Sequence, residues 1–331
     1  MIEIWAEGGA CDKNIKSALK YVRAVADAGA QALKVQWYQP ETHLIPDALR
    51  YDQTEGPAKT QWEVIKNPIY PYERWVSVID LARDQGIEFI PSVFDHESID
   101  FAEQMGIKTI KIASGEITNF ELISHAAEVA KRIALSTGGS TLDEVDEALS
   151  HIQGPEIVLM ACHLEYPTPV ERANIARTFD LQYNFPDETP GFSDHTAGIL
   201  SIPLIVATGC QVIEKHFTLA KGHGYDSDFA LDAIDLRNAV ISAERTMTLM
   251  GDSTVTPDAS EMRAREGARR SCYTARAIPT GKPLDPYDIV VLRPGTGLPP
   301  SAASTLEGMA PSKDLPKHHQ LSWEDFGNLK G

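Results

Sequence analysis

Two histidines stand at matching places in the sequence, each at the end of a short apolar segment. His195 follows Ser193 and Asp194 in the run GFSDH, and His216 ends the run QVIEKH about one βα unit later. If the two runs are neighbouring parallel strands, their ends meet at one edge and both imidazoles can reach one ion. Two imidazoles among oxygen ligands suit Mn²⁺, Fe²⁺, Co²⁺ or Zn²⁺. The pattern predicts a divalent metal site; the alternative is that the first histidine caps the following helix and the second is a hydrogen-bonded interior residue.

Two lysines lie inside apolar runs, Lys34 in ALKVQ and Lys111 in TIKIA. A buried lysine is costly unless it is paired, so each either neutralises a strand-end glutamate, such as Glu7 or Glu214, or binds an anionic substrate. Hydroxyl groups at further strand ends, and the glycine-rich turn STGGST with its capping-box pattern, favour the anion. The combination predicts a phosphate or carboxylate pocket that includes Ser92, Ser114 and Ser136.

The elements that must position these residues alternate between short β-branched runs and amphipathic helical patterns. Eight such runs separated by helices close most naturally into a (β/α)8 TIM barrel, and an open doubly wound sheet is the alternative. Active sites of these barrels lie at the carboxyl ends of the strands, where the polar residues above are found. The predicted strands are Ile2–Ala6, Ala32–Gln36, Glu88–Ser92, Thr109–Ala113, Arg132–Ser136, Ile157–Ala161, Pro190–Ser193 and Gln211–His216.

The pattern changes after Gly251. We expect a barrel over residues 1–251, a polar linker with some helix over 252–270, and a compact β-rich domain over 271–331. The segment from Pro40 to Tyr72 is predicted to be an extended loop within the barrel, and loops of that length are usually functional.

Composition excludes several classes of protein. The 331 residues carry 30 basic and 47 acidic side chains, a net charge of −17, which argues against nucleic acid as the main partner. No apolar run is long enough to cross a bilayer, and the first residues do not resemble a secretory signal, so we expect no membrane insertion and a cytoplasmic location. The four cysteines form no CxxC pair, and we expect reduced thiols.

The chain resembles the N-acetylneuraminate (sialic acid) synthase family over essentially its whole length. The resemblance is carried, in order, by AEGG, KVQ, KIASGEITN, LSTGGSTLDE, EYPTP, GFSDHTAG, VIEKHFTL and RPGTG. It implies an enzyme of the sialic or nonulosonic acid synthase type that condenses phosphoenolpyruvate with a sugar aldehyde. It also implies that the tail is an antifreeze-like (SAF) domain, which in the family covers the partner's barrel in a domain-swapped homodimer.

The resemblance also implies roles for individual residues. His195 and His216 match the divalent metal ligands, with Mn²⁺ the usual ion and Mg²⁺, Co²⁺ or Zn²⁺ as alternatives. Arg293 matches a tail arginine that reaches the acceptor's acyl group. The phosphoenolpyruvate contacts are matched by Lys34, Lys111, Ser114, Ser136 and Ser193, with Tyr166 near them, and further active-site positions by Gln36, Glu116 and Asp226.

Three segments depart from the family pattern, and the resemblance implies that the first of them, the loop after the first strand, lies on the acceptor side. The first loop reads GACDKN where the family has GxNHxG, Leu164 replaces a polar residue, and GYDSD replaces GPDH. The acceptor is therefore not assumed to be N-acetylmannosamine.

The mechanism we expect is an aldol-type condensation in which Glu116, or alternatively Asp226, handles the proton of the attacking water. Two other readings stay open: a pyruvate-dependent aldolase or a Schiff-base aldolase using Lys111 or Lys34, and a non-catalytic sugar-binding protein.

Overall fold

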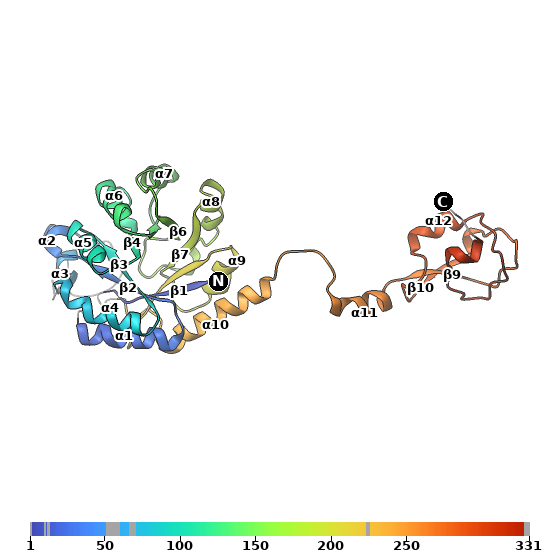
Figure 1. Cartoon of the computed structure of the whole chain (residues 1–331), viewed down its shortest axis with the longest axis horizontal. Helices are drawn as coiled ribbons and strands as arrows, with labels where there is room; N and C mark the ends of the chain where they lie inside the picture. Colours follow the sequence, from blue (N-terminus) through green and yellow to red (C-terminus); the bar gives the residue numbers. More distant parts are fainter. Residues whose placement is uncertain are drawn as a thin grey trace. The chain divides into compact units, whose positions relative to one another are not determined.

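The computed structural model describes residues 2–9, 11, 14–50, 60–65, 71–222 and 226–327, and it divides into two compact units, Met1–Gly251 and Asp252–Gly331. The first unit is a closed barrel of eight parallel strands (Figure 1). The predicted TIM barrel is thus confirmed, and the open doubly wound sheet is wrong. The strands are β1 (Glu3–Glu7), β2 (Ala32–Trp37), β3 (Glu88–Val93), β4 (Thr109–Ile112), β5 (Arg132–Ser136), β6 (Glu156–Cys162), β7 (Thr189–Asp194) and β8 (Val212–His216).

The register of the strands places the polar strand ends on one rim. Strand β1 closes the barrel against β8, with Glu7 opposite His216, and pairs on its other side with β2, where Glu7 lies opposite Lys34. Strands β7 and β8 are direct neighbours, as the histidine pattern requires. The carboxyl ends of all eight parallel strands therefore face the same mouth.

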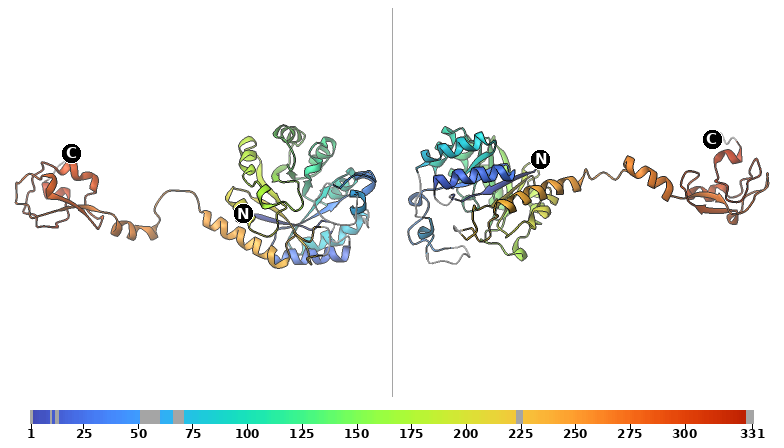
Figure 2. Two further views of the ribbon diagram at one scale, coloured as in Figure 1. Left: turned by 180° about the vertical axis from the view of Figure 1, so that it is seen from behind. Right: turned by 90° about the horizontal axis from the view of Figure 1, so that it is seen from below.

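Helices cover the outside of the barrel, and α1, α4 and α10 pack side by side there (Figure 2). Helix α1 begins at Asn14, whose side chain accepts a hydrogen bond from the Lys16 amide, and ends at Gly29, which has a φ of 83°. The helices of this unit are α1 (Ile15–Ala28), α2 (Pro40–His43), α3 (Gln61–Ile65), α4 (Val76–Asp84), α5 (His96–Gln104), α6 (Phe120–Val129), α7 (Leu142–Ser150), α8 (Arg177–Asn184), α9 (Ser201–Ala207) and α10 (Ala233–Met250), with 3₁₀ turns η2 (Tyr72–Trp75), η3 (Ser114–Glu116) and η4 (Val170–Arg172).

The interior of the barrel below the mouth is apolar and is filled by Trp5, Ala32, Ile90, Ala134, Val158, Met160 and Val212. At the opposite, amino-terminal end, Arg132 closes the barrel with charged contacts. Its guanidinium donates to both carboxylate oxygens of Glu3, at 2.8 and 3.1 Å, and to Glu88 at 2.8 Å. In such barrels, residues at the amino-terminal ends of the strands usually contribute to stability, and residues at the carboxyl-terminal ends contribute to catalysis.

The second unit holds an antiparallel pair of strands, β9 (Ser271–Thr274) and β10 (Ile289–Leu292), with two isolated bridges. Its small core contains Cys272, Ile278, Leu284, Leu298, Leu306, Leu315 and Leu321. The remaining elements are short: α12 (Ala303–Leu306), η5 (Pro286–Asp288), η6 (Pro300–Ala302) and η7 (Trp323–Phe326). A polar helix, α11 (Ala259–Ala268), with no buried residue, lies in the expected linker and starts with a capping box at Asp258.

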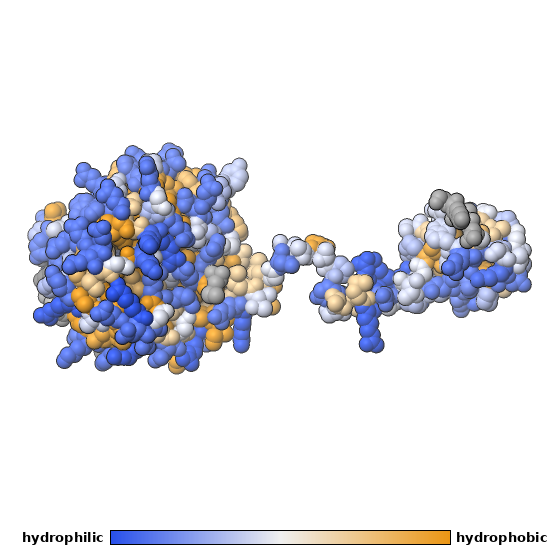
Figure 3. Space-filling view, viewed as in Figure 1, coloured by the Kyte–Doolittle hydropathy of each residue, from blue (hydrophilic) through white to orange (hydrophobic). Residues whose placement is uncertain are grey.

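Exposed polar side chains dominate the face of each unit seen in Figure 3, with apolar residues scattered among them. In the described part of the chain, no helix combines the length and apolar character needed to span a membrane.

Candidate active site

A buried group of three charges lies at the barrel mouth, where β1, β2 and β8 end. The Lys34 ammonium contacts the carboxylate of Glu7 and lies 3.3 Å from Glu214 Oε1. The amide of Gly9 and the side chain of Gln36 donate to Glu7 Oε1, at 2.8 and 3.1 Å. Of the two readings of Lys34, the structure supports the neutralisation of strand-end glutamates.

The three charges shift one another's pKa values. Burial would lower the pKa of Lys34, but Glu214 and Glu7 outweigh it and raise that pKa above its usual range. Burial would raise the pKa of Glu214, yet Lys34 and Lys111 lower it to about 2. For Glu7 burial dominates and the pKa is raised. Two neighbouring carboxylates whose pKa values are shifted in opposite directions are typical of a site that binds charged groups and transfers protons.

Lys111 has a different environment from Lys34. Its ammonium donates to the Ser136 hydroxyl at 2.7 Å and to the Ile112 carbonyl at 3.1 Å, and no carboxylate of the described residues forms an ion pair with it. Burial lowers its pKa, although Glu214 acts in the opposite direction. A buried ammonium that contacts only neutral groups is poised to receive an anion.

Gly138, in the turn after β5, and the Ser114 hydroxyl form a small cradle beside Lys111. The amide of Gly138 donates to the Ser114 hydroxyl at 3.0 Å, and a Cβ atom built on Gly138 would stand 2.8 Å from that oxygen and 3.1 Å from Cys162 Sγ. Only glycine allows this approach. The capping box of α7 is present, so the amides of Thr141 and Glu144 bond within the box and are not available to a ligand.

Two more predicted serines are buried at the same rim. The Ser92 hydroxyl has no hydrogen-bond partner in the described part of the chain, although only 1% of the residue is exposed. The Ser193 hydroxyl donates to Glu214 Oε1 at 3.3 Å and lies 3.4 Å from His195 Nε2. A buried hydroxyl without a hydrogen-bond partner is a ready contact for a polar ligand.

The two histidines meet as the sequence predicts. The ring centroids of His195 and His216 lie 5.2 Å apart, and the Tyr166 ring packs on both, at 4.0 and 5.8 Å. His195 does not cap the next helix, because the N-cap of α9 is Leu200 and has no side-chain cap. Tyr166 therefore lies at the histidine pair.

The hydrogen bonds of the two rings fit a metal site. His195 Nδ1 donates to the His163 carbonyl at 2.8 Å, and His216 Nδ1 lies 3.1 Å from Asp226 Oδ2. Metal-binding histidines usually donate one ring N–H to a carbonyl or carboxylate in this way, which leaves Nε2 for the ion. Burial would lower the pKa of His216, but Asp226 outweighs it and raises that pKa.

The protein ligands for such an ion are few. In the ranges that the structure describes, no group of three or more His, Cys, Asp and Glu side chains is arranged to hold a metal. The fit rests on the two imidazoles, and a divalent ion there would take oxygen atoms of substrate or water as further ligands.

The predicted acids take different places. Asp226 touches His216, whereas the Glu116 carboxylate is half-buried at the end of η3 and accepts a hydrogen bond from Asn119 at 2.9 Å. Of the two, only Asp226 contacts the histidine pair within the described residues. Arg293 is exposed and belongs to the second unit, after β10.

Two residues of the mouth escape sequence reasoning. Tyr38, just after β2, packs against His43 and Phe94, and burial together with Asp226 and Glu7 raises its pKa to about 12. Cys162 Sγ lies 3.9 Å from His195 Nδ1, and His195 outweighs burial to lower the pKa of that thiol. Cys162 directly follows a predicted strand, and Tyr38 comes two residues after another. This position near a strand end is the one signal that could have identified them.

Only some residues of the three segments that depart from the family pattern lie in the described part of the chain. Leu164 is exposed and its side chain lies against Gly138 and Gly139, next to the cradle. Asp12 and Lys13 of the first loop, and Gly224 and Tyr225 of the GYDSD segment, lie outside the described residues.

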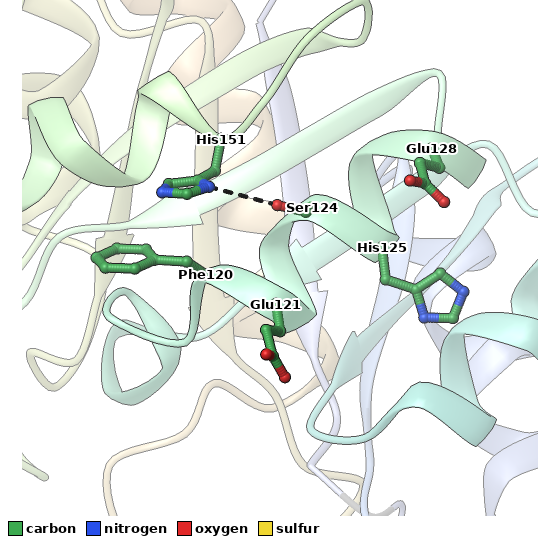
Figure 4. A pocket seen from close by; sticks show the side chains of 6 residues that line it. All are labelled: Phe120, Glu121, Ser124, His125, Glu128 and His151. Atoms are coloured by element: carbon green, nitrogen blue, oxygen red, sulfur yellow. Dashed lines mark hydrogen bonds between the residues drawn. The ribbon is translucent and has the colours of Figure 1, made fainter.

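A separate hollow lies on the outer helices, away from these strand ends (Figure 4). It has a volume of about 350 Å³ and is lined by residues of α6 and by His151, whose ring stacks on Phe120 at 4.6 Å. None of the predicted site residues lines it.

Comparison with known proteins identifies the family of this chain. The NeuB family model matches residues 21–255 and the SAF domain model matches residues 269–327. The chain is 33% identical over 323 residues to the N,N'-diacetyllegionaminic acid synthase of Legionella pneumophila, covering 94% of this chain and 90% of that protein. It is 29% identical to a pseudaminic acid synthase of Campylobacter jejuni, covering 95% and 93%.

Solved structures show the same architecture. The sialic acid synthetase of Leptospira borgpetersenii, solved in complex with citrate, has a TM-score of 0.71 at 26% identity and covers 80% of this chain and 90% of that one. A putative spore coat polysaccharide biosynthesis protein E of Chromobacterium violaceum, at 22% identity, shares the fold with a TM-score of 0.83 over 98% and 99%. The expected family and its synthase-type enzyme class are therefore confirmed: this chain belongs to the NeuB family and carries a SAF domain.

Proposed function

We propose that the protein condenses phosphoenolpyruvate with a sugar aldehyde, related to the N-acylated amino sugars of nonulosonic acid biosynthesis, and releases phosphate. The observation that carries the proposal is the pairing, at one barrel mouth, of a buried Lys111 and its serine cradle with the adjacent His195 and His216. An anion pocket beside a metal-type histidine pair is what this reaction needs. The relatives named as legionaminic and pseudaminic acid synthases support the same reaction class.

The residues around the anion pocket would hold phosphoenolpyruvate. Lys111 supplies positive charge, the hydroxyls of Ser92, Ser114 and Ser136 supply hydrogen bonds, and Gly138 allows close approach of the phosphate or carboxylate. Lys34 pairs with Glu7 and Glu214 and compensates their negative charge, so that these carboxylates do not repel the anionic substrate. Fixing both ends of the substrate supplies orientation as well as charge.

The reaction balances as follows. C3 of phosphoenolpyruvate forms a bond to the aldehyde carbon, and the aldehyde oxygen gains a proton. The oxygen of water bonds to C2, and the C2–O bond to phosphate breaks, which gives a 2-keto-3-deoxy sugar acid and inorganic phosphate. Of the two protons of the water, one ends on the aldehyde oxygen and the other leaves with the phosphate. Glu116 or Asp226 takes the first of them, and Asp226 has the advantage of lying at the histidine pair.

The site also fits a divalent ion, for which we propose Mn²⁺, with Mg²⁺, Co²⁺ or Zn²⁺ as alternatives. When bound, it would polarise the aldehyde oxygen of the acceptor. His195 and His216 would hold it through Nε2, the ring atoms that the His163 carbonyl and Asp226 leave available.

The second unit would complete the site from a partner chain. We propose a domain-swapped homodimer, working in the cytoplasm, in which Arg293 of the SAF domain contacts the acyl group of the acceptor. A small core and an exposed arginine in this unit are consistent with a domain that acts by covering another surface.

A Schiff-base aldolase is the second candidate, because burial lowers the pKa of Lys111 and favours the nucleophilic free amine. The two functions are separated by an assay of phosphate release from phosphoenolpyruvate with Mn²⁺ and a panel of amino-sugar and simple sugar aldehydes. Acceptor-dependent release that EDTA abolishes supports the proposal. Trapping of pyruvate on Lys111 by borohydride, without phosphate release, supports the aldolase instead.

A further inference from the structure

A second pair of charges lies directly behind the two histidines. Asp194 is the last residue of β7 and lies opposite Lys215 of β8 in the strand register. Their side chains form an ion pair of 2.8 Å, and each side chain is only 1% exposed. Neighbouring residues of a strand point to opposite faces, so this pair lies on the outer face of the barrel while Ser193 and Glu214 meet on the inner face.

The pair is fully hydrogen-bonded. Asp194 also accepts from the Thr196 amide at 2.8 Å and from the Ser201 hydroxyl, and Lys215 also donates to the carbonyl and, at 3.2 Å, the hydroxyl of Thr196. All three ammonium donors are therefore used. The network ties the ends of β7 and β8 to each other and to the start of α9, so that none of the three can shift alone.

Each member of the pair immediately precedes one of the histidines. We propose that Asp194 and Lys215 are positioning residues, which fix the backbone ends from which His195 and His216 project and so set the distance between the two imidazoles. This inference rests on the proposed function, because it requires that His195 and His216 bind the proposed metal ion.

Stability alone is a poor explanation for the pair. A buried ion pair is often no more stabilising than apolar side chains of similar volume, whereas its hydrogen bonds have defined directions. Sites that bind metals lose affinity when residues that orient their ligands are changed. The Arg132 network provides a contrast, since it joins Glu3 and Glu88 at the opposite end of the same barrel.

The test uses Mn²⁺ alone, followed by electron paramagnetic resonance, on the full chain without substrate. The variants are Lys215→Met, the double variant Asp194→Asn with Lys215→Met, and Arg132→Met as the loss of a partly buried, ion-paired cation at the other end of the barrel. Thermal unfolding is measured for each variant. The single variant leaves an unpaired buried carboxylate and should lose the most stability, whereas the double variant removes both charges and should regain much of it.

The inference predicts that the double variant still binds Mn²⁺ at least about tenfold more weakly than wild type, while Arg132→Met is destabilised but keeps its affinity. Wild-type affinity in the double variant would overturn the inference and leave the proposed function intact. So would an equal loss of affinity in Arg132→Met. If the wild-type protein shows no Mn²⁺ binding that His216→Ala removes, the metal assignment itself fails and the inference falls with it.

Discussion

The Nδ1 atom of His216 lies 3.1 Å from the Oδ2 atom of Asp226, and this contact leaves the other ring nitrogen of His216 available to the proposed metal ion. Asp226 therefore orients the His216 ring, whether or not it also takes a proton during the reaction.

Asp226→Asn should weaken Mn²⁺ binding by about 10- to 100-fold, because an amide no longer holds the imidazole in the required tautomer. Titration with Mn²⁺ under paramagnetic resonance measures the change. Asp228, exposed two residues later, provides the control, and Asp228→Asn should bind as wild type does. Equal affinity in both variants would show that Asp226 does not orient the ligand.

Lys111 should make binding of phosphoenolpyruvate depend on pH. Burial lowers its pKa below the ordinary value of 10.5, and only the protonated amine attracts the anion. Binding is therefore full below the Lys111 pKa and weakens as the pH rises through it, so KM for phosphoenolpyruvate should rise by up to about tenfold per pH unit. Lys111→Arg, which stays charged, should flatten this profile. Lys108→Met, a change at an exposed lysine, is the control and should keep the wild-type pH dependence of KM. If Lys111→Arg shows the same pH dependence as this control, the assignment of Lys111 is contradicted.

Tyr38 should contribute to acceptor binding. Its hydroxyl stays protonated because burial raises its pKa, so it can donate a hydrogen bond beside Asp226. Tyr38→Phe should raise KM for the acceptor by about three- to tenfold and leave KM for phosphoenolpyruvate unchanged. Tyr72→Phe, which removes a hydrogen bond of 2.8 Å to Asp95, is the matched loss of a hydroxyl and should leave both values unchanged. A rise in both KM values for Tyr38→Phe would place the residue elsewhere.

Arg132 should matter for stability and not for chemistry. Arg132→Met leaves Glu3 and Glu88 without their shared cation and should lower the free energy of unfolding by about 1–2 kcal/mol, because the two glutamate side chains are 30% and 31% exposed and partly screened by solvent. Chemical denaturation measures this loss. Because the network lies at the amino-terminal end of the strands, kcat and both KM values should stay at wild-type levels at temperatures where the variant is folded.

Mixing two inactive variants tests the domain-swapped dimer. In a swapped dimer of one His216→Ala chain and one Arg293→Ala chain, one site carries both defects and the other carries neither. Re-association of equal amounts should therefore restore about a quarter of wild-type activity, given random pairing of a two-fold dimer. Activity that stays at the level of the separate variants would show that each site is built from one chain.

Much of the barrel and its rim follows from sequence because both depend on local patterns. Apolar runs of strand length predict β1 to β8, and the parallel topology then brings residues that follow those runs, such as His195 and His216, to one mouth. Boundaries shift only slightly: β1 begins at Glu3 and extends to Glu7, one residue later than predicted at each end.

Other features depend on contacts between distant segments, which no local pattern encodes. The role of the His163 carbonyl depends on how the loop after β6 folds over His195, and any backbone carbonyl looks the same in sequence. The division of labour between the two lysines was also open, because only the barrel register reveals that Lys34 meets Glu7 while Lys111 meets Ser136.

In the proposed reaction, water attacks carbon, so phosphate should leave with the oxygen that joined it to C2. The most direct measurement is the reaction of phosphoenolpyruvate and an accepted sugar aldehyde in ¹⁸O-labelled water, with mass spectrometry of the released phosphate and of the product. Attack of water on carbon predicts unlabelled phosphate formed in equal amount with a 2-keto-3-deoxy sugar acid. Phosphate that carries ¹⁸O would show that water attacks phosphorus and that a pyruvate aldol reaction follows, which would contradict it.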